Sequence, residues 1–227
     1  MPFDPQFALD TMLPLAEAAY DLTKLPTWLK LVATIQPGNF GFVATSGAAT
    51  VIAFRGTETT GEWLEDFDGL ALPNLFGKGM VHQGFQDQYS NLRASILAAL
   101  AQADLHIPLW ITGHSLGAAV ATLCASDAEL VGGRSSLAYT WAGPRVGWHD
   151  YAGWFKTQVP NFFRIVNEWD IVPRVPPAAN GYEHVGTEVS VDGGRPKLDA
   201  KFLKRAHNLE LSYRPGVQRL LPMKQAA

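Results

Sequence analysis

The stretch PLWITGHSLGAAVATL, residues 108–123, constrains the fold of this chain more than any other. Pro108–Thr112 is a short, continuous apolar run, which is typical of a strand buried on both faces. Leu116–Val131 is small, apolar and rich in alanine, which favours a tightly packed helix. Between them lies the motif GHSLG, residues 113–117. Because glycine has no Cβ, a serine flanked in this way can occupy a sharp strand-to-helix turn with its hydroxyl exposed. Taken alone, the motif also fits a serine that caps a helix after a glycine turn.

The rest of the chain alternates between predicted helices and strands. The helical patterns are Pro5–Tyr20 and Gln83–Ala103. The β-rich runs are Phe40–Thr45 and Thr50–Phe54, which read as a hairpin, followed by Leu137–Trp141, Phe162–Val166 and His184–Val191. Strands that alternate with helices predict an α/β fold with a mainly parallel central sheet flanked by helices. Neither a repeat nor a linker divides the sequence, so we expect a single domain over residues 1–227.

Composition excludes several classes of protein. Charged residues make up 17% of the chain, against roughly 25% in an average soluble domain, so a long disordered tail or a coiled coil is excluded. The net charge of −3 gives no electrostatic basis for binding nucleic acid. A lone cysteine, Cys124, excludes an internal disulfide and a cysteine-based zinc site. We expect no metal, no cofactor and a monomer.

Two stretches without charged side chains, Leu31–Phe54 and Leu105–Ser126, are long enough to span a bilayer. Both contain turn-forming proline and glycine, so we interpret them as buried segments of a soluble core and expect no transmembrane segment. The first twenty residues carry acids and no base, unlike a secretory signal. That pattern is expected of a cytoplasmic protein, of a leaderless one, or of a secreted one already processed.

A serine nucleophile needs a histidine to take its proton and a carboxylate to orient that histidine. In folds of this class the order along the chain is serine, acid, histidine. Asp170 follows the buried run Phe162–Val166 closely, which places it where an α/β sheet carries its functional groups. Glu168 is the near alternative, whereas Asp127 lies on the helix after the serine and is expected to point away.

Two histidines follow Asp170 in the sequence. His184 lies in a stretch that alternates like a strand, where histidine is usually structural. His207 lies in a predicted loop, from which a side chain can reach across the edge of a sheet. We therefore favour His207 over His184 as the base.

An acyl-transfer site also needs donors for the oxyanion of the tetrahedral intermediate. The amide of Leu116, directly after the serine, is one candidate. A second donor is expected from a loop after an earlier strand, where Thr57 offers both an amide and a hydroxyl. An ordinary turn threonine is the alternative interpretation.

Beyond these residues, several motifs occur in a familiar order: FRGT with a following WLEDF, VHQGF, TGHSLGAAVATL, WAGPRVG, FRIVNEWDIVPRVPP and YEHVG. Together they resemble the class 3, fungal-type lipases of the α/β-hydrolase superfamily, from about Thr50 to Tyr213. The resemblance implies an α/β-hydrolase fold, with Ser115 as nucleophile, Asp170 as acid and His207 as base. It also implies that Thr57 and Leu116 form the oxyanion hole.

The resemblance further implies a lid over residues 59–67. Trp63, Leu64 and Phe67 would form its apolar, substrate-facing side, and Asp66 would steady the oxyanion loop. The fungal enzymes carry disulfides, which this chain cannot form.

The expected function is hydrolysis of carboxylic esters through an acyl-enzyme, with acylglycerols as the first choice of substrate and transient contact with a lipid interface. An esterase of short-chain or aryl esters and a phospholipase A1 are the alternatives. From a different class, an inactive module that binds lipid is a further alternative. Charge is uneven, with five acids within residues 58–68 and eight bases from Arg195 to Lys224. The sequence leaves open whether these are two solvated faces or a polarised rim around the site.

Overall fold

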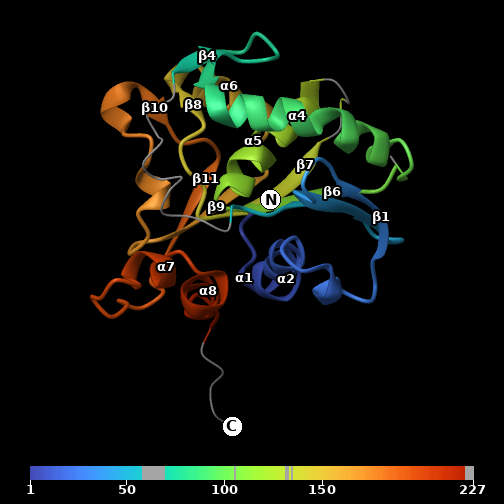
Figure 1. Ribbon diagram of the computed structural model, residues 1–227. Helices are drawn as coiled ribbons and strands as arrows, with labels where there is room; N and C mark the ends of the chain where they lie inside the picture. The colour runs from blue at the N-terminus through green and yellow to red at the C-terminus, as the bar shows by residue number, and fades with distance from the viewer. Residues whose placement is uncertain (58–69, 105, 131–132, 134, 223–227) are drawn as a thin grey trace.

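A computed structural model describes residues 1–57, 70–104, 106–130, 133 and 135–222. Its centre is a seven-stranded sheet in the order β1-β2-β3-β6-β7-β9-β11 (Figure 1). The strands are β1 (Lys30–Ile35), β2 (Gly41–Thr45), β3 (Thr50–Phe54), β6 (Leu109–His114), β7 (Ser136–Trp141), β9 (Phe162–Asn167) and β11 (Thr187–Val191). The first two pairings are antiparallel, and every pairing from β3 onward is parallel.

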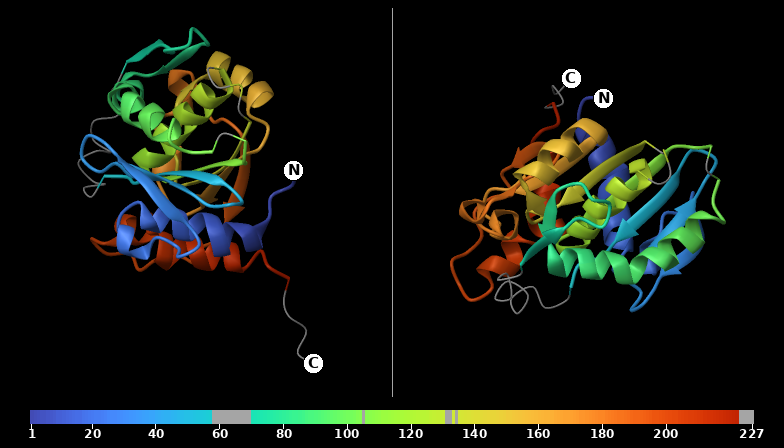
Figure 2. Two further views of the ribbon diagram at one scale, coloured as in Figure 1. Left: turned by 90° about the vertical axis from the view of Figure 1, so that its right-hand side faces the viewer. Right: turned by 90° about the horizontal axis from the view of Figure 1, so that it is seen from above.

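Helices cover both faces of this sheet (Figure 2). Above it in Figure 1 lie α4 (Gln83–Leu100), α5 (Leu116–Leu130) and α6 (His149–Gln158). Below it lie α1 (Pro5–Phe7), α2 (Leu13–Ala18), α7 (Phe202–Ala206) and α8 (Arg214–Gln218). Wider π-type turns, η1 (Ala8–Met12) and η5 (Leu209–Tyr213), run directly into α2 and α8. Each layer has its own apolar cluster, so the sheet is buried on both sides, as the continuous apolar strands predicted.

A smaller antiparallel sheet of β4 (Ala71–Pro73), β5 (Met80–His82), β8 (Gly147–Trp148) and β10 (Tyr182–Glu183) lies beside the upper layer. Its strands have only two or three residues each. The rest of the fold is consistent with an α/β-hydrolase architecture, in which parallel strands end at one edge where functional groups gather.

Most predicted elements are confirmed, within a few residues at their ends. The hairpin of β2 and β3, the strand and helix around GHSLG, and strands β7 and β9 all form. The prediction of a continuous strand over His184–Val191 is wrong. Gly186 has a φ of +65°, and a Cβ there would lie 2.6 Å from the carbonyl oxygen of Phe162. This turn separates His184 from β11, which starts only at Thr187.

The two charge-free stretches fold into the core. Leu31–Phe54 supplies β2, β3 and all of β1 except its first residue, and the second stretch supplies β6 and most of α5. Across the described residues, no helix combines the length and the apolar character that crossing a membrane requires.

Candidate active site

Ser115 occupies the sharp turn between β6 and α5. Its φ of +60° lies in the left-handed region, which is strained for a residue with a Cβ. The glycines on either side are required by close contacts. A Cβ on Gly113 would lie 2.2 Å from the carbonyl oxygen of Gly117, and one on Gly117 would lie 2.5 Å from that of Arg55. The predicted strained turn is therefore present, with glycine where the backbones of strand, helix and neighbouring loop meet.

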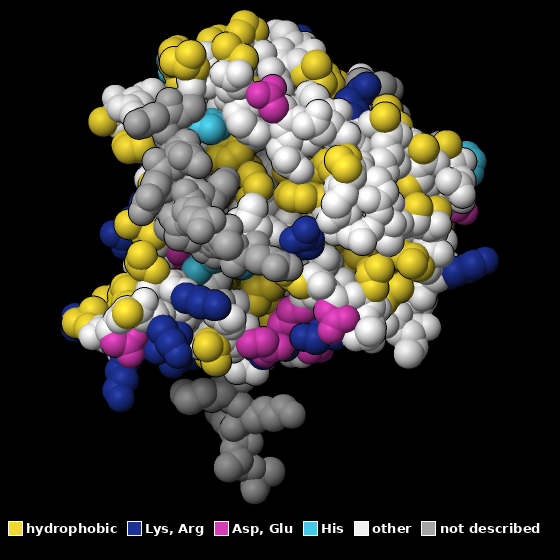
Figure 3. Space-filling model, in the orientation of Figure 1, with side chains coloured by type: hydrophobic (Ala, Val, Ile, Leu, Met, Phe, Trp, Pro, Cys, Tyr) yellow, Lys and Arg dark blue, Asp and Glu magenta, His cyan; other side chains and the backbone are white. Residues whose placement is uncertain are grey.

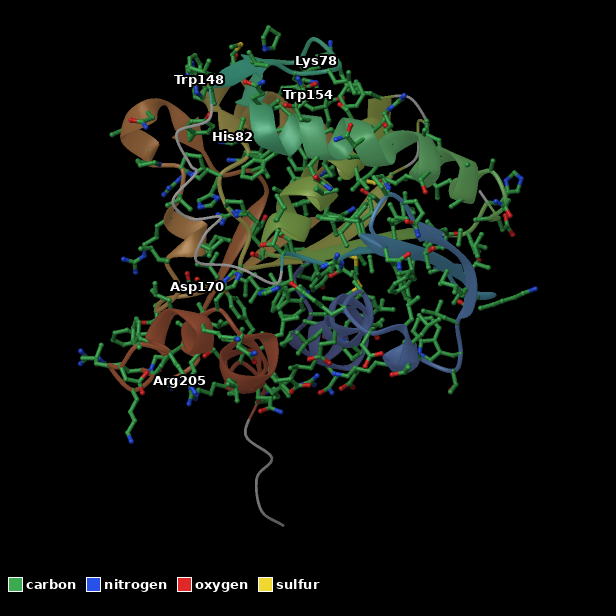
Figure 4. All side chains as sticks on the ribbon, in the orientation of Figure 1. Lys78, His82, Trp148, Trp154, Asp170 and Arg205 are labelled. Carbon is green, nitrogen blue, oxygen red and sulfur yellow. The ribbon has the colours of Figure 1, made fainter. Side chains whose placement is uncertain are left out.

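Asp170, His207 and Tyr213, which we call the base side, form a buried hydrogen-bonded group. Asp170 follows β9, and His207 is the residue directly after α7. The Nδ1 of His207 lies 2.7 Å from Oδ2 of Asp170, and the Tyr213 hydroxyl donates to the same oxygen at 2.7 Å. The other carboxylate oxygen, Oδ1, accepts the amide N–H of Val172 at 3.0 Å. Figure 4 shows Asp170 between the sheet and the lower helices.

These contacts determine the protonation of the base side. Burial alone would raise the pKa of Asp170, but the facing His207 and the hydrogen bonds that the carboxylate accepts hold that pKa below its usual value. An ionised carboxylate can only accept, so Nδ1 of His207 carries the hydrogen. In the neutral ring Nε2 then has a free lone pair, and it is buried without a hydrogen-bond partner among the described residues. A lone pair at this position is what a general base requires.

Gly56, Tyr20 and His114, which we call the loop side, form a second hydrogen-bonded chain. The amide N–H of Gly56 donates to the Tyr20 hydroxyl at 2.8 Å, and that hydroxyl lies 2.7 Å from Nδ1 of His114. The Nε2 of His114 lies 2.9 Å from the backbone carbonyl oxygen of His207. This chain therefore joins the loop after β3 to the backbone of the base side.

Only one arrangement of hydrogens satisfies the loop side. The carbonyl oxygen of His207 can only accept, so Nε2 of His114 carries the hydrogen. Burial, reinforced by the neighbouring His207, lowers the pKa of His114 to about 3, so the ring is neutral and Nδ1 accepts. The Tyr20 hydroxyl consequently donates to Nδ1, and burial raises the pKa of Tyr20 to about 12, which keeps that proton in place.

Three side-chain atoms at the site are buried without a hydrogen-bond partner among the described residues: Ser115 Oγ, His207 Nε2 and Thr57 Oγ1. Ser115 and His207 are therefore not hydrogen-bonded to each other. Catalytic hydrogen bonds are often long in the absence of substrate. Buried polar groups are normally paired, so a group of unpaired atoms at one place indicates a site for a polar ligand.

Packing brings these atoms to one place. The backbone before Thr57 packs closely against the serine turn, because a Cβ on Gly56 would lie only 2.8 Å from Cβ of Ser115. Thr57, His114 and His207 line one pocket of about 340 Å³. Leu116 is the first residue of α5, where backbone N–H groups have no partner within the helix. The sequence-predicted residues Ser115, Leu116, Thr57, His207 and Asp170 are thus assembled at one edge of the sheet.

The rejected alternatives lie elsewhere. His184 donates a hydrogen bond from Nε2 to the backbone carbonyl oxygen of Pro173, at 2.7 Å. Asp127 lies on the far part of α5, where it accepts a hydrogen bond from the Tyr89 hydroxyl and forms an ion pair with Arg93 at 2.7 Å.

Two further candidates are separated by burial. Glu168 is exposed, whereas Asp170 is buried against His207. Cys124 is buried, and burial raises the pKa of its thiol, as expected of a core residue.

The predicted lid, residues 59–67 with Trp63, Leu64 and Phe67, lies outside the described residues, as does Asp66. Among the residues that are described, no group of three or more His, Cys, Asp or Glu side chains is arranged to hold a metal ion.

Sequence reasoning missed two residues of the site. Tyr20 contacts partners 36 and 94 positions away, and Tyr213 contacts one 43 positions away. A tyrosine near the end of a helix has no local signature of such a role.

Comparison with known proteins gives consistent results. The sequence profile of the family described as lipase (class 3) matches residues 51–180, more than half of the chain. A lipase from Rhizomucor miehei is 32% identical over 194 residues, which are 80% of this chain and 52% of that protein. A phospholipase A1-II 6 from Oryza sativa subsp. japonica is 32% identical over 203 residues, covering 70% of this chain and 48% of that protein.

Among solved structures, one described as a triacylglycerol lipase whose catalytic centre is formed by a serine protease triad superposes with a TM-score of 0.72. It is 30% identical, and the match covers 81% of this chain and 79% of that one. This chain spans about half the length of the curated relatives that it matches.

Proposed function

The chain belongs to the class 3 lipase family, and from that premise we propose that it is a serine hydrolase of carboxylic esters, with acylglycerols as its principal substrates. The observation that carries the proposal is the 2.7 Å contact between Asp170 and Nδ1 of His207, which leaves Nε2 as a free base beside the serine turn. The relatives described as lipases support the choice of acylglycerols.

In the proposed reaction, Ser115 Oγ attacks the ester carbonyl carbon while Nε2 of His207 takes the hydroxyl proton. Asp170 stabilises the resulting imidazolium, and the amides of Leu116 and Thr57 donate to the oxyanion. Collapse of the tetrahedral intermediate breaks the bond to the alcohol, which leaves with the proton from His207. Water, deprotonated by His207, then attacks the carbonyl carbon of the acyl-enzyme. The bond from that carbon to Ser115 Oγ breaks, His207 returns the proton to Oγ, and the fatty acid is released.

Labelling with a fluorophosphonate probe tests this mechanism directly. We expect one covalent adduct, mapped by mass spectrometry to the peptide that contains Ser115. Replacing Ser115 by alanine should abolish the adduct and lower kcat by about a million-fold, as in a comparable serine hydrolase. The labelling is repeated with detergent, to include any state in which the site is open only at an interface. An adduct on another residue, or hydrolysis by Ser115→Ala, would overturn the mechanism.

Phospholipase A1 activity is the second candidate, because a relative described as a phospholipase A1-II 6 is 32% identical over 203 residues. Lys24 and Lys204 line the same pocket as Thr57 and His207, but Glu17 and Glu210 line it too, so the substrate class is decided by rates and not by pocket charge. Rates on tributyrin, long-chain triacylglycerol and phosphatidylcholine distinguish the three substrate classes. Hydrolysis of tributyrin alone would indicate an esterase. Release of fatty acid from phosphatidylcholine at a comparable rate would favour the phospholipase.

A further inference from the structure

The segment that leads into His207 carries an exposed surface that the proposed chemistry does not use. It consists of α7 and the turn before it, and we call it the α7 surface: Arg195, Lys197, Leu198, Lys201, Leu203 and Lys204. All six side chains are exposed. The dark-blue and yellow side chains at the lower left of Figure 3 lie on this part of the molecule, and Arg205 marks the segment in Figure 4.

The apolar part of the surface is unusual for so short a segment. Leu198 is 71% exposed and Leu203 is 47% exposed. Single exposed leucines are common on proteins, but here two lie within six residues of each other in a basic segment, and this pairing of aliphatic and basic side chains is the one by which surfaces bind a lipid interface.

The basic part of the surface is not neutralised. The only carboxylate within this segment, Asp199, is paired with Arg205 at 2.6 Å. Nearby Asp192 lies 3.8 Å from Arg219 and accepts the amide N–H of Gly194. Within the described part of the chain, no carboxylate lies in ion-pair distance of Lys197, Lys201 or Lys204. The surface therefore presents net positive charge next to exposed leucine.

The surface is directly connected to the candidate active site. The last residue of α7 is Ala206, and His207 follows it. Lys204 lines the pocket of about 340 Å³ together with Thr57, His114 and His207. A flat partner that contacts Lys204 and the leucines beside it would therefore lie at the mouth of the pocket.

We propose that the α7 surface docks the protein onto a lipid surface that carries anionic head groups, and so places the pocket against the substrate. The leucines insert among the acyl chains, and Lys197, Lys201 and Lys204 contact the head groups. The proposal rests on the proposed ester hydrolysis for its purpose. The docking itself needs no hydrolysis, so the two can fail separately.

Charge complementarity sets the expected preference. Each basic residue near an anionic membrane contributes roughly a fivefold gain in partitioning, and the effect is screened within a Debye length of about 10 Å at 0.1 M salt. Three unpaired lysines should therefore give a preference for anionic over neutral vesicles of about 100-fold at low salt. Most of that preference should disappear at high salt, whereas the contribution of the leucines should remain.

The test is vesicle sedimentation with the full chain in which Ser115 is replaced by alanine, so that lipid is not consumed. Vesicles of phosphatidylcholine are compared with vesicles containing phosphatidylglycerol. In that background, Lys197→Glu with Lys201→Glu should lower binding to anionic vesicles at least about 20-fold. Leu198→Ser with Leu203→Ser should lower binding to both kinds of vesicle.

Matched controls change the same residue types on other faces. Lys30→Glu with Lys156→Glu makes the same change in net charge on β1 and α6. Leu31→Ser with Leu97→Ser removes two other exposed leucines. Both controls should bind vesicles within about threefold of the parent. In the active protein, all four double variants should hydrolyse a water-soluble p-nitrophenyl ester at the parental rate, because none of these residues lines the pocket.

Several results would overturn the proposal. Equal binding of the parent to neutral and anionic vesicles would remove the electrostatic argument. An equal loss in the charge control would mean that net charge, and not this surface, attracts the protein. Loss of binding in the lysine variant with none in the leucine variant would indicate a site for a soluble polyanion. Vesicle binding by a protein that cleaves no ester would refute the proposed function and leave the docking surface intact.

Discussion

Two neighbouring histidines at the site have opposite surroundings, and the difference separates the base side from the loop side. The rings of His114 and His207 lie 4.5 Å apart, and both side chains are buried. His114 uses both nitrogens, one at Tyr20 and one at the carbonyl oxygen of His207. His207 uses only Nδ1, at an ionised carboxylate, and leaves Nε2 without a partner among the described residues. Equal burial therefore produces a neutral structural link in one case and a candidate base in the other.

The two sides differ in the group at which each series of hydrogen bonds ends. The base side ends at the carboxylate of Asp170, which stabilises positive charge on His207. The loop side ends at a peptide carbonyl and a peptide N–H, which carry no net charge. Substitutions on the base side should therefore change the chemistry of proton transfer, and those on the loop side should change the position of the oxyanion donors.

The largest expected difference concerns Asp170. Asp170→Asn keeps the shape of the side chain but removes the charge and favours the wrong tautomer of His207, so we expect kcat to fall by about 10⁴-fold. Steady-state rates on a soluble short-chain ester measure the effect, with circular dichroism as the test of folding. Glu168→Gln, at the exposed carboxylate two residues earlier, should stay within about twofold of the parent. A loss below tenfold in Asp170→Asn would contradict the assignment of the acid.

A substitution at Thr57 tests the hydrogen-bond donors to the oxyanion, which the loop side positions. Thr57→Ala removes the buried hydroxyl and keeps the amide, so we expect kcat to fall by at most about 10²–10³-fold. Affinity for a boronic acid that mimics the tetrahedral intermediate should fall in the same proportion, with KM nearly unchanged. If KM rises while kcat stays constant, Thr57 contacts the substrate without stabilising the oxyanion.

A substitution at Tyr20 tests whether the hydrogen bonds that join the loop side to the base side matter for catalysis. Tyr20→Phe keeps the ring but leaves the Gly56 N–H and Nδ1 of His114 without their partner, at a cost of about 1–3 kcal/mol for a buried group. We expect kcat to fall by about tenfold and boronate affinity to fall with it. Tyr139→Phe removes a hydroxyl that accepts the Asp4 N–H far from the site, and should lower stability without lowering kcat. Equal kcat in the two variants would show that the loop side has no part in catalysis.

The last comparison concerns the pH dependence of stability and not the rate of hydrolysis. The pKa of His114 in the folded state, about 3, lies below the unfolded value of about 6.5. The unfolded chain therefore binds an additional proton below pH 6.5, and stability is lost as the pH falls from about 6.5 toward 3. Each such histidine contributes a slope of about 1.4 kcal/mol per pH unit within that window.

Urea unfolding between pH 7 and pH 4 measures that slope. His114→Gln should reduce the slope of stability against pH by the contribution of one proton, about 1.4 kcal/mol per pH unit. His184→Gln should reduce it by the same amount, because burial also lowers the pKa of His184 to about 3. Only His114→Gln should also lower kcat, since His184 contacts Pro173 and not the site. An unchanged slope in His114→Gln would mean that this ring is not held neutral.

Much of the fold was predictable from local patterns. Continuous apolar runs identified the central strands, and GHSLG located the strained turn, because glycine there has a local steric cause. The failed prediction over His184–Val191 shows the limit of such patterns. Alternation continues through Gly186, but a contact with Phe162 on another strand breaks the strand at that glycine.

For the site, the order of residues, the strand and loop context of each candidate and the family resemblance led to the choice of Ser115, Asp170 and His207, and their assignment as catalytic groups stays a prediction. Chain order and residue type select candidates because the chemistry requires a nucleophile, a base and a carboxylate. Only the tertiary structure decided which nitrogen of each histidine carries its hydrogen, because that depends on the group facing the other nitrogen. Tyr20 and Tyr213 became visible only there, since hydrogen bonds over 36 to 94 residues are set by packing across the sheet, which no local pattern encodes.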